Sequence, residues 1–168
     1  PYEDMQSFRK SFCDVYALKP EQLQLGFLKV LKGSHMQEMC GEYGIVHKEQ
    51  EPYEVLFTRW VDYGDVLKLK TVENMVEVYY NSGQFWHTLE YLVPFEKDAF
   101  TFYEKLGSFY EKKGYSEISH SRMRRYEILL EYLQEETDVP TEVAAQKMLY
   151  DLYLREKLKK RPVFAPDQ

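Results

Sequence analysis

Cysteine is scarce in this sequence: its 168 residues include only Cys13 and Cys40, which lie far apart along the chain. Two cysteines are too few for a disulfide-rich scaffold, for a zinc site made of cysteines alone or for an iron–sulfur cluster held by this chain alone. Neither has a second cysteine or a histidine at the close spacing of a metal or redox motif. We therefore interpret both as buried thiols that pack like small hydrophobic side chains.

Long apolar runs are also missing. The longest apolar stretch, Leu23–Leu31, is interrupted by Gln24, Gly26 and Lys29, so it falls short of the roughly 18 apolar residues that a membrane-spanning helix needs. The chain begins at Pro1, with neither a methionine nor a signal peptide, which is typical of a piece of a longer protein. We expect no membrane partner and a cytoplasmic location in which both thiols are reduced.

Positive charge is in deficit. The 22 Lys and Arg residues face 28 Asp and Glu residues, which gives a formal net charge of −6 at pH 7. A general nucleic-acid binder would show a basic face, so the net negative charge argues against this class of protein, and we expect no nucleic-acid partner. Basic residues cluster at 122–125 and 155–161. We interpret them as solvated helix faces or anion contacts, the second at the C-terminal end of a helix, where cations complement the helix dipole.

Aromatic residues, by contrast, are abundant. The chain has 15 Tyr and 10 Phe residues, and hydrophobic residues make up 44% of it. Large apolar groups in this number can offset the entropy lost when the chain becomes ordered, which argues against intrinsic disorder. Length and composition together predict one domain, or one domain and the edge of another, around a hydrophobic core.

The first third of the chain mixes two hydrophobic periods. Apolar residues at three-to-four spacing predict a helix over residues 1–16, and Ser34 can cap a second, short helix. Alternating apolar residues predict a strand that begins at Leu23. Residues with β-branched and aromatic side chains predict further strands at 45–47 and 53–60.

From Asp62 onward the period is that of helices. Five helices are predicted from apolar stripes, the first closed by Gly83 and the last starting after Pro140. The predicted fold class is therefore mainly α, of the α+β type. A short strand-containing segment at residues 1–61 precedes a bundle of about five helices at residues 62–168, with the boundary near residue 61.

No complete active site is visible in the sequence. It has no phosphate-binding glycine loop, no dinucleotide-binding glycine motif, no nucleophile elbow and no His-Glu-x-x-His motif. Glu117 and His120 form one Glu-x-x-His pair, but a carboxylate-bridged dimetal bundle needs two such pairs and two further carboxylates. We interpret His87, which is close to Glu90 and Tyr91, as a satisfied histidine of the core rather than as a ligand.

The most unusual segment is Glu21–Gly33, with the sequence EQLQLGFLKVLKG. Gln24 and Gly26 interrupt its apolar pattern, and glycine within a strand often marks the close approach of another backbone or of a ligand. Lys29 and Lys32 follow at the carboxyl end of the predicted strand, where ligands bind in α/β folds and where ammonium groups can neutralise an anion. An amphipathic strand with solvated lysines explains the pattern equally well.

Three stretches carry a resemblance to a known family: LQLGFLKVLKG (23–33), PYEVLFTRW (52–60) and MVEVYYNSGQF (75–85). They resemble the C-terminal part of radical S-adenosylmethionine proteins with a cobalamin-binding domain, a family often labelled magnesium-protoporphyrin IX monomethyl ester oxidative cyclase. The resemblance covers nearly the whole chain. It implies that a cobalamin-binding domain and a radical S-adenosylmethionine barrel precede a helical C-terminal domain. Residues 7–33 would form the last helix and strand of that barrel.

The resemblance implies that the parent protein is an enzyme, but it places no active site in this chain. The family's Cys-x-x-x-Cys-x-x-Cys triad, which holds a four-iron–four-sulfur cluster, has no counterpart here. The iron–sulfur cluster, S-adenosylmethionine and cobalamin would therefore belong to the rest of the parent polypeptide, which is the expected partner. The expected role of this chain is to close the barrel and shape the substrate pocket, with Gln24, Lys29 and Lys32 facing the substrate.

Two alternatives stay open. One is a helical interaction module, without a catalytic role, whose exposed Tyr and Phe residues dock a partner protein or a second copy of the chain. The other is an independent metalloenzyme bundle, which predicts bound iron or manganese in the purified chain.

Overall fold

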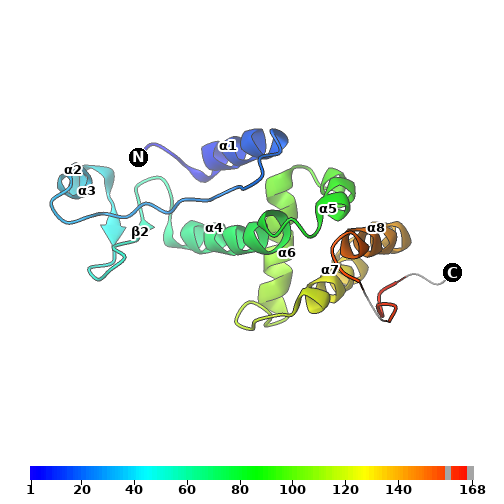
Figure 1. Cartoon of the computed structure of the whole chain (residues 1–168). Coiled ribbons are helices and arrows are strands. Elements are labelled where there is room, and N and C mark those ends of the chain that lie inside the picture. Colours follow the sequence, from blue (N-terminus) through cyan, green and yellow to red (C-terminus); the bar gives the residue numbers. More distant parts are fainter. Residues whose placement is uncertain (158–159, 166–168) are drawn as a thin grey trace.

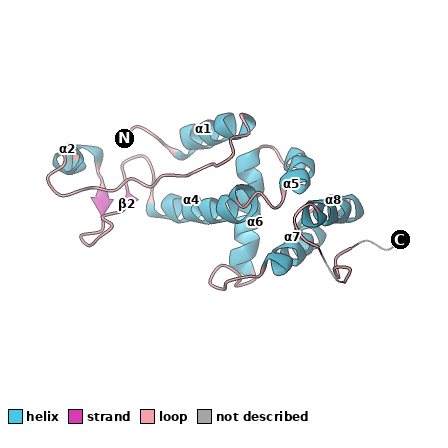
Figure 2. Cartoon of the chain, viewed as in Figure 1, coloured by secondary structure: helices cyan, strands magenta, loops and turns pink. Residues whose placement is uncertain are grey.

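The computed structural model describes residues 1–157 and 160–165, and within them the chain is mainly helical (Figure 1). Two short strands, at residues 46–47 and 55–57, lie between the N-terminal helices and the run of helices that makes up the rest of the chain (Figure 2). The predicted fold class is therefore confirmed. The elements, in chain order, are α1 (Met5–Ala17), α2 (His35–Glu38), α3 (Cys40–Tyr43), β1 (Val46–His47), β2 (Val55–Phe57), α4 (Tyr63–Met75), the π-helical turn η1 (Val76–Asn81), α5 (Trp86–Leu92), the 3-10 turn η2 (Val93–Phe95), α6 (Ala99–Lys112), α7 (Arg122–Glu136) and α8 (Thr141–Tyr153).

Side-chain caps set the starts of several helices. The Asp62 carboxylate accepts a hydrogen bond from the backbone N–H of Asp65 at the start of α4. Asp98 accepts one from Thr101 at the start of α6, and Ser34 caps α2, as predicted. Each cap satisfies an N–H group that no carbonyl of the same helix can reach. The five helices predicted after Asp62 correspond to α4–α8.

Helices α4 and α6 cross at close range in the centre of the molecule (Figure 1). Gly107 of α6 lies at this crossing, where a Cβ atom would come within 2.4 Å of Thr71 Cγ2 on α4. A residue without a side chain is therefore needed for the two helices to approach this closely.

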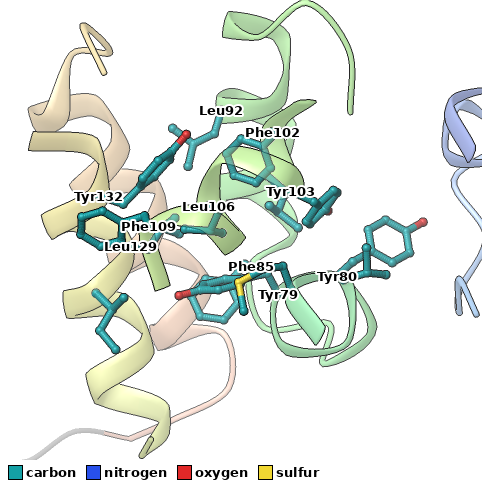
Figure 3. Close-up of a cluster of buried hydrophobic side chains, with 14 of the residues drawn as sticks. Tyr79, Tyr80, Phe85, Leu92, Phe102, Tyr103, Leu106, Phe109, Leu129 and Tyr132 are labelled. Atoms are coloured by element: carbon teal, nitrogen blue, oxygen red, sulfur yellow. The ribbon is translucent and has the colours of Figure 1, made fainter. Parts of the chain in front are cut away.

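The core around this crossing is largely aromatic (Figure 3). The Tyr79 hydroxyl shares a hydrogen bond with the Tyr110 hydroxyl (2.7 Å) and donates one to the Arg125 carbonyl oxygen (3.1 Å). Burial raises the pKa of Tyr79 well above its usual value, so the hydroxyl stays protonated in this setting. Buried residues of this core come from η1, α6 and α7: Tyr79, Phe102, Tyr103, Leu106, Phe109, Tyr110, Leu129 and Tyr132.

Helix α1 packs against the same core. The Phe12 ring meets the Phe100 ring edge-on at a centroid distance of 5.5 Å, and Arg9 Nε lies 3.0 Å from the Asp98 carboxylate. Leu23, beyond α1, is buried in the core as well. The predicted boundary near residue 61 stays a prediction, because contacts of the helical core extend to residues on both sides of it.

The predicted strand that begins at Leu23 is wrong. In residues 22–31, which run as a long segment along the molecule (Figure 1), only Lys29 forms a β-bridge, and its partner is Glu54. The other two predicted strands are present but shorter, as the antiparallel pair β1 and β2. Alternating apolar residues give a strand one buried face, but a strand also needs a neighbouring backbone. Within the described residues, that neighbour is available only near Lys29.

Candidate functional site

The end of the π-helical turn holds the extended segment 22–31 against the helical core. Asn81, the last residue of η1, accepts a hydrogen bond from the backbone N–H of Leu23 (2.9 Å) and donates one to the carbonyl oxygen of Leu23 (3.0 Å). The Asn81 side chain thus takes the place of a neighbouring strand at this residue. The Tyr80 hydroxyl donates a hydrogen bond to the Pro20 carbonyl oxygen. Two consecutive residues of η1 therefore fix the start of the segment, and π-helical turns occur frequently at functional sites.

A pocket of about 420 Å³ lies between this segment and the helix formed by α4 and η1. Its volume is within the range of small-molecule sites. Glu73, Glu77 and Asn81 recur every four residues, so they share one face of that helix. The polar residues that line the pocket are Gln24, Lys29, Glu54, Glu73, Glu77 and Asn81. We call it the polar pocket.

The three glutamates of the polar pocket have different electrostatic surroundings. Lys70 donates a hydrogen bond to the Glu54 carboxylate, and this contact lowers the pKa of Glu54. Burial raises the pKa of Glu73, and the negative charge of Glu54 adds to the rise. Glu77 accepts a hydrogen bond from Asn81 Nδ2 (2.8 Å). The pocket therefore holds carboxylates that differ in proton affinity.

Two of the three residues predicted to face a substrate lie in this pocket. Gln24 and Lys29 line it from the extended segment, and both side chains are exposed. Lys32 does not line it: its Nζ lies 5.4 Å from the centroid of the Tyr53 ring. Sequence reasoning missed the carboxylates and Asn81. The spacing of four from Glu73 to Asn81 is the signal that could have revealed them.

The lining of the polar pocket is suited to binding and to proton transfer. Carboxylates accept hydrogen bonds, Lys29 donates them, and the Gln24 amide does both. The pocket can therefore bind a ligand that has both hydrogen-bond donors and acceptors. Among the described residues that line the pocket, none is a serine, threonine, cysteine or histidine. The pocket thus offers acid–base groups but no hydroxyl or thiol nucleophile.

The candidate metal and redox residues lie elsewhere. Within residues 1–157 and 160–165, no group of three or more His, Cys, Asp or Glu side chains is arranged to hold a metal ion. Glu117 and His120 lie in the loop before α7, where His120 Nε2 forms a hydrogen bond with the Tyr115 carbonyl oxygen (2.9 Å). Cys13 and Cys40 are free thiols and are half-buried, so the expectation that both are buried is wrong.

Basic residues of the first cluster, 122–125, form ion pairs within the chain. Arg122 pairs with Glu156, and Arg124 Nη1 lies 3.2 Å from Glu127. The second basic run, 155–161, begins just after α8, and its residues 158–159 lie outside the described residues. No helix of the described residues is both long and apolar enough to cross a membrane.

A separate polar cluster joins α5 to α8. The Asp151 carboxylate, which is 3% exposed, accepts hydrogen bonds from the Thr88 backbone N–H (2.8 Å), the Thr88 hydroxyl (2.7 Å) and His87 Nδ1 (2.7 Å). It also accepts one from the His87 backbone N–H (3.1 Å). Phe85, at the N-cap of α5, has no side-chain acceptor, so Asp151 supplies the negative charge that a helix N-terminus favours. His87 is therefore satisfied, as predicted, by a residue distant in sequence, but its side chain is 35% exposed and does not lie in the core.

Fold and site together define a mainly helical protein with a polar pocket at the edge of its core. A family model described as "Protein of unknown function (DUF4080)" matches residues 41–168, and the chain belongs to this family. Comparisons with curated proteins and with solved structures gave no match. The matched region contains the three glutamates of the polar pocket and Asn81, whereas Gln24 and Lys29 precede it.

Proposed function

We propose that this chain is the C-terminal, non-cluster-binding region of a cytoplasmic radical S-adenosylmethionine enzyme that also has a cobalamin-binding domain. In this proposal the chain closes the barrel of the parent enzyme and shapes its substrate pocket. The proposal starts from the sequence resemblance. The observation that carries it is that, within the described residues, the backbone N–H groups of residues 24–28 in the extended segment donate no hydrogen bond.

Residues 24–28 have an open backbone edge, apart from the Leu28 carbonyl oxygen, which accepts a hydrogen bond from the Val55 N–H (2.9 Å). Within the described residues, none of their backbone N–H groups donates a hydrogen bond to a backbone or side-chain acceptor. A backbone edge of this kind is a template to which another strand can add. Among the described residues, no atom lies within 4 Å of the Cβ position of Gly26, so a partner backbone has room to approach. A neighbouring strand from the parent barrel would complete this edge.

The polar pocket lies beside that edge. In β/α barrels, ligands bind at the carboxyl ends of the strands. Lys29 is near the carboxyl end of the extended segment and lines the pocket, and Gln24 lines it from nearer the amino end. If the segment serves as a barrel strand, these two side chains and the carboxylates of α4 and η1 contribute to the wall of the substrate pocket.

Apolar side chains around the small sheet support the same role. Leu31 is 58% exposed, and Leu28, Val46 and Phe57 are exposed as well. Several exposed apolar residues close to one another are typical of a surface that another part of a protein covers. In the proposal, the barrel of the parent polypeptide covers them.

The thiols of this chain do not fit an iron–sulfur cluster. Cys13 packs against the helical core, whereas Cys40 packs against the separate small cluster of Val30, Ile45 and Val55. A four-iron cluster needs several thiolates that converge on one point. The proposal therefore assigns the cluster, S-adenosylmethionine and cobalamin to the rest of the parent polypeptide and derives no chemical step through them.

The test compares two lysines in the intact parent enzyme. Lys29→Ala removes an ammonium group from the polar pocket, so we expect substrate turnover to fall roughly tenfold, the effect of losing one charged hydrogen bond. Iron content per chain should not change. Lys32→Ala is the matched control, because Lys32 lies outside the pocket, and it should turn over substrate like the wild type. Unchanged turnover in Lys29→Ala would contradict the assignment of the pocket.

An exposed face of α8 favours a second candidate function, an interaction module. Val143, Tyr150 and Leu154 follow helical spacing and are 38%, 53% and 59% exposed. Sedimentation velocity of the full chain tests its simplest form, in which a second copy docks on this face. Self-association that is lost in Tyr150→Ser/Leu154→Ser supports it, and a wild-type chain that stays monomeric at micromolar concentrations removes it.

A further inference from the structure

The extended segment borders another pocket besides the polar pocket. This pocket, of about 140 Å³, lies between the segment, α1, β2 and the start of α4. Among its described lining residues only Glu3, which is exposed, and Thr58 have polar side chains, and the Thr58 hydroxyl already accepts hydrogen bonds from two backbone N–H groups. The other lining residues are Pro1, Phe8, Leu25, Gly26, Phe27, Leu28, Val55, Trp60, Val61, Val66 and Leu69. We call it the apolar pocket.

The apolar pocket is large enough for a small ring or a short hydrocarbon chain. An apolar cavity of about 150 Å³, lined by leucine, isoleucine and phenylalanine side chains, binds benzene. The apolar pocket has a similar volume and a similar lining, with the rings of Phe8 and Trp60 among its walls. Apolar groups of a ligand that enter it are therefore taken out of water, which favours binding.

One face of the helix formed by α4 and η1 runs along both pockets. Val66 and Leu69 line the apolar pocket, and Glu73 and Glu77 line the polar pocket. The spacings of three and four residues place these four side chains on the same face of the helix. Val66 and Leu69 are buried, whereas Glu77 is exposed. The face therefore changes from apolar to acidic along a single line.

The extended segment joins the two pockets on the opposite side. Leu25, Gly26 and Phe27 line both of them. Leu25 and Phe27 pack against the helical core. Gly26 has no side chain, and among the described residues no atom lies within 4 Å of its Cβ position. The space at residue 26 is therefore open between the polar pocket and the apolar pocket.

We propose that the polar pocket and the apolar pocket together bind one amphiphilic organic molecule. Its head group forms hydrogen bonds in the polar pocket with Gln24, Lys29 and Glu73, and its ring or short hydrocarbon chain lies in the apolar pocket. The atoms that connect the two parts cross at Gly26. A strand added to the open edge lies in the plane of the backbone, whereas side-chain positions point out of that plane, so the strand and the molecule do not exclude each other. This inference rests on the proposed function, in which the amphiphilic molecule is the substrate of the parent enzyme.

The test titrates the full chain with a series of phenyl amides, from 2-phenylacetamide to 5-phenylpentanamide, and with butanamide, which has the same head group but no ring. The amide NMR signals of residues 24–29 report binding. We expect the best phenyl amide to have a Kd at least roughly tenfold lower than that of butanamide, because the apolar pocket removes its ring from water. Ring protons of this probe should show NOEs to the Trp60 side chain.

Gly26→Leu tests the crossing between the pockets. Gly26 does not have a positive φ, and its Cβ position is open among the described residues, so the fold should tolerate the substitution. The added side chain fills the crossing, so the Kd of the phenyl amide should rise to that of butanamide, while the Kd of butanamide stays unchanged. Gly41→Leu is the matched control. Gly41 has the same freedom of space and backbone but lines neither pocket, so this variant should bind both probes like the wild type.

Each outcome decides for or against the two-pocket site. The proposal is overturned if no phenyl amide binds more tightly than butanamide, or if the best phenyl amide binds Gly26→Leu as tightly as the wild type. If Gly26→Leu fails to fold, the NOEs decide: contacts between the ring and Trp60 support the proposal, and their absence overturns it. The proposed function fails separately, through unchanged turnover of the parent enzyme in Lys29→Ala, and tight binding of a phenyl amide would then still establish the site in this chain.

Discussion

The helical core differs from the extended segment and the small sheet in two respects: how far its side chains are buried, and how far its polar groups are hydrogen-bonded. In the core, the buried carboxylate of Asp151 and the hydroxyl of Thr88 satisfy each other across two helices. Around the small sheet, the buried cluster of the described residues consists of Val30, Ile45 and Val55 alone. The backbone N–H groups of residues 24–28 donate no hydrogen bond within the described part of the chain.

This contrast indicates that the helical core and the extended segment have different roles. The core is closed, because its large apolar side chains pack against one another from α1 to α8. The extended segment is open, because it has a free backbone edge, exposed apolar side chains and a polar pocket beside it. We infer that the core provides most of the stability and that the segment provides the surface for a further part of the parent protein. Three measurements can break or sharpen this contrast.

The largest effect is expected for Asp151→Ala. The substitution leaves two backbone N–H groups, the Thr88 hydroxyl and His87 Nδ1 without their acceptor in a buried place. We expect the free energy of unfolding to fall by about 3 kcal/mol, the scale for breaking a buried charged network. Urea unfolding followed by circular dichroism measures it.

The control for that substitution is Asp138→Ala, which removes an exposed aspartate from the loop between α7 and α8. It should change the free energy of unfolding by no more than about 0.5 kcal/mol. If the two variants are equally stable, the polar cluster around Asp151 does not stabilise the contact between α5 and α8.

A smaller effect is expected for a pair of glycines, one from each region. Gly107→Ala forces a Cβ atom against Thr71, whose hydroxyl is held by the Leu67 carbonyl oxygen and by Glu111. The clash exceeds the gain in helix propensity, so we expect a net loss of about 1 kcal/mol. The Cβ atom of Gly26→Ala meets no atom of the described residues within 4 Å, so this substitution should not destabilise the chain. Thermal unfolding measures the loss of stability in each variant. Equal losses would contradict the difference between the closed core and the open segment.

The helices could be predicted from the sequence because their signals are local. Asp62 and Ser34 lie at the caps, and apolar residues recur at helical spacing through α4–α8. The strand at Leu23 was mispredicted for a related reason: alternation describes one face of a strand but not its neighbour. The half-buried state of the two thiols likewise depends on packing between elements.

The candidate site could be predicted only in part. Gln24 and Lys29 stood out because they interrupt an apolar pattern. Glu54 joins them through the Lys29–Glu54 bridge, and Asn81 does so because its side chain binds the backbone of Leu23. Both are contacts between residues far apart in sequence, which periodicity does not report.

The most direct test of the contrast is hydrogen exchange at the amides of residues 24–28, measured in this chain alone and in the full parent polypeptide. The account predicts fast exchange in the isolated chain and at least roughly a hundredfold slower exchange in the parent, where a neighbouring strand protects these amides. The amides of Val72 and Tyr79, in the core, should be protected in both. Equal exchange of residues 24–28 in the two proteins would contradict the account.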